Sequence, residues 1–162
     1  MIGVRDVTLR AVRVTAKVDY AVRALVELAA AETPTVKGDR LAEAQALPVK
    51  FLENILAELR RHGIVASQRG SEGGYRFARP PEGITVADVI RAVEGPLADV
   101  HGTPPEALDP PGAAAPVREV WLATRVALRS VLERVTIADI ATGQLPAEVT
   151  ALLETPDAWA RR

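Results

Sequence analysis

Residues 36–79 have the sequence VKGDRLAEAQALPVKFLENILAELRRHGIVASQRGSEGGYRFAR, and this stretch decides the fold of the chain. Its hydrophobic spacing predicts a short helix over about 37–45, a connection over 46–48, and a second helix that ends at Gly63. Pro48 marks the start of the second helix, because the first backbone N–H of a helix has no partner and a proline there costs no hydrogen bond. Two short helices with a tight connection predict a helix-turn-helix.

The second helix has two faces. Four apolar residues fall at helical spacing and are expected to face the core: Leu52, Ile55, Leu56 and Leu59. Four other residues of its first turns lie elsewhere on its surface: Val49, Lys50, Glu53 and Asn54. A recognition helix exposes its N-terminal residues to the major groove of DNA in this way.

A β-hairpin is predicted directly after this helix. Residues 64–67 form the first expected strand and residues 75–77 the second, with a glycine-rich turn over 69–74 between them. Arg69 stands beside the glycine-rich tip, which suits insertion along a phosphate backbone or into a minor groove. The whole stretch therefore predicts a winged helix-turn-helix.

Further motifs precede and follow this stretch in a fixed order. They are Asp19-Tyr20-Ala21 with Arg23-Ala24-Leu25, Phe51-Leu52-Glu53 with Ile55-Leu56, Gly63-Ile64-Val65, Arg69-Gly70 with Gly73-Gly74-Tyr75-Arg76, and Val89-Ile90-Arg91-Ala92-Val93-Glu94-Gly95. Over about residues 12–97 this series resembles the Rrf2 family of bacterial transcriptional regulators. The resemblance implies a mainly α-helical fold with a small β-hairpin wing and a long C-terminal dimerisation helix. It also implies a homodimer, most often a repressor, on a pseudo-palindromic operator in double-stranded DNA.

The residue pattern and the family resemblance together indicate which residues are candidates for contact with DNA. Candidates for phosphate contacts are Lys37, Lys50, Arg60, Arg61 and Arg76, each of which could instead be an ordinary solvated surface charge. Val49, Lys50, Glu53 and Asn54 are candidates for base edges, since Glu accepts from cytosine N4 and Asn pairs with adenine. The resemblance assigns base reading to Glu53 and minor-groove entry to Arg69, with Gly70 beside it. Position 48, often a small polar residue in the family, is proline here, and position 50 is lysine; both suggest an altered operator.

The charge distribution agrees with this placement. The net charge of the 162-residue chain is −1, but residues 36–79 hold eight Lys and Arg against five acidic residues. Residues 80–162 hold seven Arg against twelve acidic residues. Positive charge thus gathers on the stretch expected to touch DNA, although ordinary scatter would also produce an excess of this size.

The absence of cysteine excludes disulfides, thiolate zinc sites and cysteine-ligated iron–sulfur clusters. Many members of the family carry three cluster cysteines at the position of residues 97–116, where this chain has none and has five prolines instead. We expect a mobile or extended loop there and no cofactor, since the remaining metal-ligand types form a weak set: Asp99, His101, Glu106 and Asp109. The signal is then expected to be a small-molecule or protein effector; some cluster-free members act with a metabolic enzyme.

The expected organisation has four parts. Residues 1–13 are an N-terminal extension without a family counterpart, or else an arm that contacts DNA, and residues 14–96 are the winged domain. Residues 97–116 are the proline-rich loop, and residues 117–162 hold a dimerisation helix over 117–135 and a tail in which Trp159 packs back. The dimer stripe of that helix comprises Val117, Val120, Trp121, Thr124, Leu128, Val131 and Val135. The alternative is a helix buried within its own chain.

Other function classes are disfavoured. Two histidines, no cysteine and no glycine-rich phosphate loop between a strand and a helix leave no catalytic constellation, so the chain is not expected to be an enzyme. No apolar run approaches the ~20 residues of a membrane span, and a cytoplasmic location is expected. The remaining alternative is a winged-helix protein-interaction module, or a regulatory partner of a metabolic enzyme. Replacing Arg69 with alanine would separate these functions, because only a DNA reader loses affinity for DNA.

Overall fold

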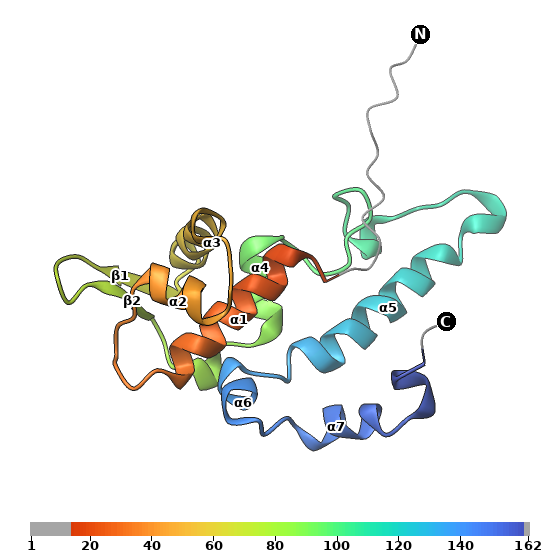
Figure 1. Cartoon of the computed structure of the whole chain (residues 1–162). Helices are drawn as coiled ribbons and strands as arrows, with labels where there is room; N and C mark the ends of the chain where they lie inside the picture. Colours follow the sequence, from red (N-terminus) through yellow and green to blue (C-terminus); the bar gives the residue numbers. More distant parts are fainter. Residues whose placement is uncertain (1–13, 161–162) are drawn as a thin grey trace, which may run out of the picture.

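The computed structural model describes residues 14–160, so the expected extension over residues 1–13 lies outside the described residues. The winged domain begins with three helices, α1 (Ala16–Ala30), α2 (Gly38–Ala44) and α3 (Val49–Arg61). The strands β1 (Val65–Gln68) and β2 (Gly74–Phe77) follow, and α4 (Val86–Val93) comes after a single 3-10 turn at Pro81–Gly83. This order is the mainly helical, winged helix-turn-helix architecture that the sequence predicts (Figure 1).

Side-chain caps define two of these helices. The Thr15 hydroxyl accepts from the backbone N–H of Val18 at the start of α1. Thr85 and Asp88 form a reciprocal capping box at the start of α4. Pro48 is the N-cap of α3 and not its first helical residue, because its extended ψ of 118° leaves Val49 as the first residue with helical geometry.

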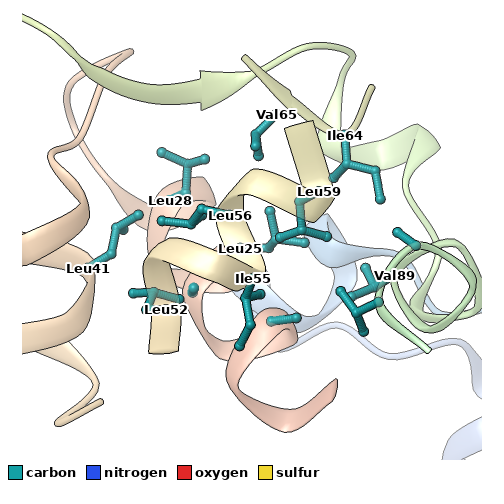
Figure 2. Close-up of a cluster of buried hydrophobic side chains, with 14 of the residues drawn as sticks. Leu25, Leu28, Leu41, Leu52, Ile55, Leu56, Leu59, Ile64, Val65 and Val89 are labelled. Atoms are coloured by element: carbon teal, nitrogen blue, oxygen red, sulfur yellow. The ribbon is translucent and has the colours of Figure 1, made fainter. Parts of the chain in front are cut away.

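The core surrounds α3. Leu52, Ile55, Leu56 and Leu59 are all buried, which confirms the predicted inner face of the helix. Figure 2 shows them against Leu25 and Leu28 of α1, Leu41 of α2 and Val89 of α4. Because these four side chains lie in the core, the opposite face of α3 is exposed to solvent.

The wing is joined to the domain by a third segment. The two strands pair antiparallel with Val65 opposite Phe77 and Gln68 opposite Gly74. Val36, before α2, forms a bridge with Tyr75: the Val36 N–H donates to the Tyr75 carbonyl at 2.9 Å, and the Tyr75 N–H donates back at 2.7 Å. The wing is therefore joined to the winged domain at two places: where its strands leave and re-enter the chain, and at the bridge between Tyr75 of β2 and Val36 before α2.

Residues that follow the long helix α5 (Val117–Leu132) return to the winged domain. Ile137, the first residue of α6 (Ile137–Thr142), is fully buried in the same core as α3, and Thr136 bridges Thr85. Val135 is also buried, at 6% exposure, and its carbonyl accepts from the N–H of Val86. This corrects the expected dimer stripe, because Val135 lies beyond the end of the long helix and packs within its own chain.

The long helix α5 (Val117–Leu132) is shorter than the expected 117–135; it begins far from the winged domain and runs back toward it (Figure 1). None of its residues is buried. The last α-helix of the described residues is α7 (Ala147–Leu153). Trp159, however, is 78% exposed; its Nε1–H donates to the Leu153 carbonyl, but its ring does not pack back as expected.

The proline-rich segment is more ordered than expected. It contains two 3-10 turns, Pro105–Ala107 and Gly112–Ala114. Pro105 is buried, and Glu106 Oε2 lies 2.6 Å from Nη1 of Arg125 on α5. The expectation of a mobile or extended loop is therefore wrong for the part of the segment around Pro105, because proline rings and one ion pair give it a packing surface on α5.

Candidate nucleic-acid interface

The N-terminal turns of α3 present the side chains expected to read bases. Val49, Lys50, Glu53 and Asn54 are all exposed, and Val49 is 45% exposed although it is apolar. Among the described residues, the polar side chains of Lys50, Glu53 and Asn54 have no hydrogen bond or ion pair. These side chains are thus free to form bonds with an external partner.

Aromatic contacts fix the start of α3 against α1. The rings of Tyr20 and Phe51 meet edge to face with their centroids 5.8 Å apart, and the guanidinium of Arg23 lies 5.8 Å from the Tyr20 ring centroid. Arg23 also donates to the side chain and the backbone carbonyl of Gln45, at the end of α2. Tyr20 therefore packs between α1 and α3, and Arg23 of α1 holds the turn between α2 and α3.

The other end of α3 is held by polar contacts. His62 is its C-cap, with its backbone N–H donating to the Glu58 carbonyl at 3.1 Å. Arg60 donates to the Ser67 hydroxyl at 3.0 Å and so connects α3 to β1 of the wing. Arg61 is 69% exposed and lies 3.8 Å from the Glu58 carboxylate. Both arginines are accessible, but Arg60 also joins α3 to the wing.

The wing exposes its predicted residues. Arg69 and Gly70 lie exposed in the turn between the strands, and Gly70 adopts a left-handed φ of +105°. Arg76 is exposed on β2, with a long 3.4 Å bond to the Phe77 carbonyl. A Cβ on Gly74 would lie 2.5 Å from the Val36 carbonyl oxygen, so only glycine permits the close approach of the wing to Val36.

The base of the wing lies beside the start of α2. A shallow depression of about 400 Å³ is lined by Thr33–Lys37, Arg40 and Ser71–Gly73. Lys37 is a predicted phosphate contact, whereas Arg40 was missed by sequence reasoning; it is exposed and lies 3.2 Å from Glu43. No spacing rule reveals Arg40, because its neighbours on the wing are about thirty residues away in the chain.

The remaining predicted surface is on α5. Val117, Val120 and Trp121 are exposed, with Val120 at 56%, whereas Thr124, Leu128 and Val131 are partly covered by their own chain. Val126, outside the predicted stripe, is 64% exposed. The helix therefore has apolar side chains that its own chain leaves uncovered.

Comparison with known proteins then decides the family. The model of the Rrf2 family, described as an iron-dependent transcriptional regulator, matches residues 14–143. The chain belongs to the Rrf2 family. A Mycobacterium tuberculosis protein named as an HTH-type transcriptional regulator is 48% identical over 143 residues, which are 88% of this chain and 89% of that protein.

Solved structures agree with the assignment. CymR of Bacillus subtilis, titled as its global cysteine regulator, has a TM-score of 0.69 at 30% identity, covering 82% of this chain and 98% of CymR. IscR of T. potens has a TM-score of 0.63 at 30% identity and covers 94% of both chains. This Rrf2 protein is thus a winged-helix, DNA-binding transcriptional regulator. Its relatives are regulators and not enzymes, in agreement with the prediction.

The residues of this member do not fit a cysteine-ligated iron centre. The sequence has no cysteine, and residues 14–160 bring together no group of three or more His, Asp or Glu side chains that would hold a metal ion. Asp99, His101, Glu106 and Asp109 are therefore not gathered into a site. No helix in the same range is long and apolar enough to cross a membrane.

Proposed function

We propose that this Rrf2 protein is a homodimeric repressor that binds a pseudo-palindromic operator. One observation carries the proposal: the unpaired polar side chains at the start of α3 belong to the same folded domain as the exposed wing arginine Arg69. The Val36–Tyr75 bridge and the Arg60–Ser67 bond join the wing to that domain. A helix and a wing at fixed separation can enter a major groove and an adjacent minor groove together.

Each part of the interface has its own role in this proposal. Glu53 would accept from cytosine N4 and Asn54 would pair with adenine, while Val49 would pack on a thymine methyl group. Lys37, Lys50, Arg60, Arg61 and Arg76 would contact phosphates and set the register without reading sequence. Arg69 would enter the minor groove, with Gly70 allowing the backbone to approach the duplex.

Dimerisation is proposed to occur through α5. A helix with no buried residue and exposed valines and tryptophan gains free energy by packing against a twofold-related copy. A symmetric pair of winged domains would then match two operator half-sites about one helical turn of DNA apart. Sedimentation equilibrium of the purified protein tests this step, with a dimer mass expected and a monomer at all concentrations contradicting it.

Repression is tested by transcription in vitro. A template that carries the bound site between its promoter elements should give less transcript as the protein is added, and a template with one half-site scrambled should not respond. An increase in transcript would instead identify an activator. Because no iron–sulfur cluster fits this chain, we propose that the signal is a small-molecule or protein effector.

A further inference from the structure

A cavity lies between the winged domain and the long helix. Its volume is about 550 Å³, within the range of small-molecule sites. The end of α4, the segment after it and the middle of α5 supply its walls. The apolar part of the lining includes Leu97 and three prolines, Pro96, Pro104 and Pro105.

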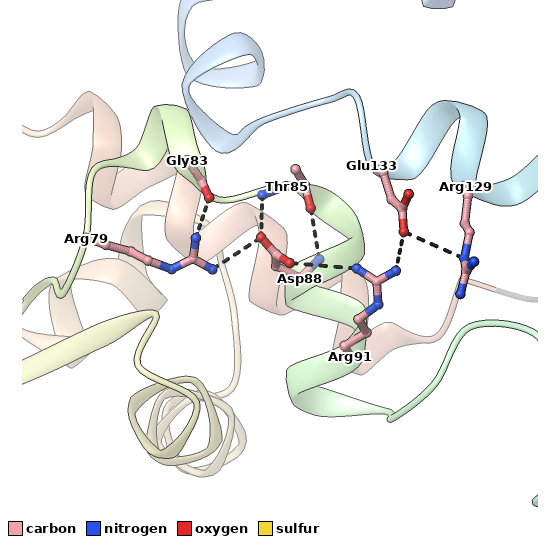
Figure 3. Close-up of polar contacts among 7 residues, drawn as sticks. All are labelled: Arg79, Gly83, Thr85, Asp88, Arg91, Arg129 and Glu133. Atoms are coloured by element: carbon pink, nitrogen blue, oxygen red, sulfur yellow. Dashed lines mark hydrogen bonds and ion pairs between the residues drawn. The ribbon is translucent and has the colours of Figure 1, made fainter.

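Three arginines line the same cavity: Arg91 from α4, and Arg125 and Arg129 from α5. The side chain of Arg125 is only 16% exposed, so its charge is largely shielded from bulk water. Figure 3 shows that Arg91 and Arg129 share the carboxylate of Glu133, which lies 3.6 Å from Nε of Arg129. Arg91 also lies 3.8 Å from Asp88.

Arg125 has a replaceable partner. Its Nη1 lies 2.6 Å from Oε2 of Glu106, whose side chain is 59% exposed. A backbone hydrogen bond and the Arg125 guanidinium hold the pKa of Glu106 below its usual range, so the carboxylate is charged at neutral pH. An exposed carboxylate keeps its hydration when it turns away, whereas the shielded guanidinium needs an anion in its place.

We propose that this cavity binds a small organic anion whose charged group takes the place of the Glu106 carboxylate on Arg125. The apolar body of the ligand would lie against Leu97 and Pro105. Arg129 also lines the cavity, but Glu133 pairs with it and the carboxylate of Asp99 is part of the lining, so Arg125 is the main proposed contact of the anion. The shared chemistry is one carboxylate or phosphate on a compact apolar body. The inference deepens the proposed function, since it rests on an effector acting as the signal of the regulator.

The position of the cavity suits regulation. Glu133, just after α5, joins Arg91 of α4 to Arg129 of α5, so the ion pairs in its wall connect the winged domain to the helix proposed to form the dimer. An anion that binds among these charges stabilises one arrangement of α4 and α5 over another. A ligand changes DNA binding only through such a difference in affinity between two arrangements.

Benzoate and phenyl phosphate are suitable probes, one for each anionic group. The resonances of the arginine Nε–H groups can be followed by two-dimensional NMR while each probe is added to the full chain. At least one probe should cause saturable shifts of the Arg125 and Arg129 signals by about 10 mM, the concentration range of weak ligands. Shifts spread evenly over all arginines, or no saturable shift with either probe, would overturn the proposal.

Three variants sharpen the test. Arg125→Gln should weaken binding of the active probe by about tenfold or more, the effect of losing one charge-assisted hydrogen bond. Glu106→Gln should strengthen it severalfold, because the competing carboxylate is gone; a misfolded variant cannot produce such a gain. Arg118→Gln, on an exposed position of α5 outside the cavity, is the matched control and should bind as the wild type does.

These titrations contain no DNA, so their result is independent of whether the protein represses transcription. Saturable binding at Arg125 with no effect on operator affinity would support the site and contradict its role as the signal. Loss of binding in Arg118→Gln together with Arg125→Gln, or unchanged affinity in Glu106→Gln, would contradict the proposed contact between the anion and Arg125.

Discussion

Lys17 and Glu58 are joined by an ion pair of 2.7 Å between Nζ and Oε2. The same ammonium group donates to the carbonyl of Val93 at 2.7 Å. One side chain of α1 therefore connects the recognition helix α3 to the C-terminal end of α4. Both partners are largely shielded, with 29% and 23% of their side chains exposed, so the pair fixes α3 more firmly than a surface ion pair does.

Replacing Lys17 with methionine should destabilise the protein by about 1–3 kcal/mol, because it leaves the Glu58 carboxylate without its charge partner and the Val93 carbonyl without its donor. Chemical denaturation followed by circular dichroism measures this loss. Arg61→Met is the matched control: Arg61 is 69% exposed and 3.8 Å from the same carboxylate, so its loss should change stability by less than about 0.5 kcal/mol. Equal losses of stability in the two variants would contradict the claim that Lys17 holds α1, α3 and α4 together.

Gly74→Ala should separate the wing from Val36. The new Cβ would lie 2.5 Å from the Val36 carbonyl oxygen, and φ is +154°, so the bridge to Tyr75 must open. We expect a loss of about 2 kcal/mol or more in stability and a weaker affinity for DNA. Gly83→Ala meets nothing within 4 Å and should behave as the wild type in both assays.

Arg69→Ala should weaken DNA binding by about tenfold and reduce the slope of log affinity against log salt by about 1. The reason is that an exposed arginine in the wing neutralises DNA charge without supporting the fold. Fluorescence anisotropy with a labelled duplex at several salt concentrations measures both quantities. Arg134→Ala removes the same charge near Glu148, far from the wing in the chain, and should leave them unchanged. If Arg69→Ala binds DNA with the same affinity and salt dependence as the wild type, the alternative function as a protein-interaction module is favoured.

Val120→Asp should convert the proposed dimer to a monomer. Val120 is 56% exposed on α5, and a carboxylate there would be buried without a partner in a dimer interface. Sedimentation velocity distinguishes the two states. Ser130→Asp adds the same charge at an exposed position of α5 outside the predicted stripe and should remain dimeric. If the Val120→Asp variant is still a dimer, the dimer interface does not include this face of α5.

The capping box of α4 should contribute stability that depends on pH. Burial raises the pKa of Asp88, but hydrogen bonds from the Thr85 N–H and from Arg79 outweigh that effect, so the pKa lies below its usual range (Figure 3). A carboxylate with a lowered pKa stabilises the fold above its unfolded pKa and loses this effect as the pH falls through the folded value.

Asp88→Asn should therefore be less stable than the wild type by about 1 kcal/mol at neutral pH. The difference should shrink as the pH falls below about 4, the unfolded value for Asp. Thermal unfolding across this pH range measures it. Asp109→Asn, an exposed carboxylate in the proline-rich segment, should follow the wild type at every pH. A difference that is constant across the range would show that the charge of Asp88 is not involved.

Local patterns predicted the winged domain well, and contacts distant in the chain were missed. The spacing of Leu52, Ile55, Leu56 and Leu59 identified the buried face of α3, because helix periodicity is local information. The bridge between Val36 and Tyr75 was missed, since one pair of backbone bonds leaves no hydrophobic pattern.

The region after residue 96 was predicted less well for the same reason. Val135 continued the apolar spacing of α5, but its helix ends at Leu132 and the chain turns back to the core, where Ile137 is buried. The packing of Pro105 beside α5 also depends on tertiary contacts that proline content alone does not reveal. The side chains predicted to contact DNA from the first turns of α3 and from the wing are exposed, whereas the place of Arg40 beside the base of the wing follows only from the fold.

The central claim is that this chain reads an inverted repeat as a dimer. The most direct measurement is selection of random duplex DNA by the purified protein at moderate salt, followed by sequencing of the bound fraction. We expect enrichment of an inverted repeat with half-sites about one helical turn apart, and loss of that enrichment with Arg69→Ala. Folded, dimeric protein that enriches no sequence, both alone and with cell extract as a source of effector, would contradict it.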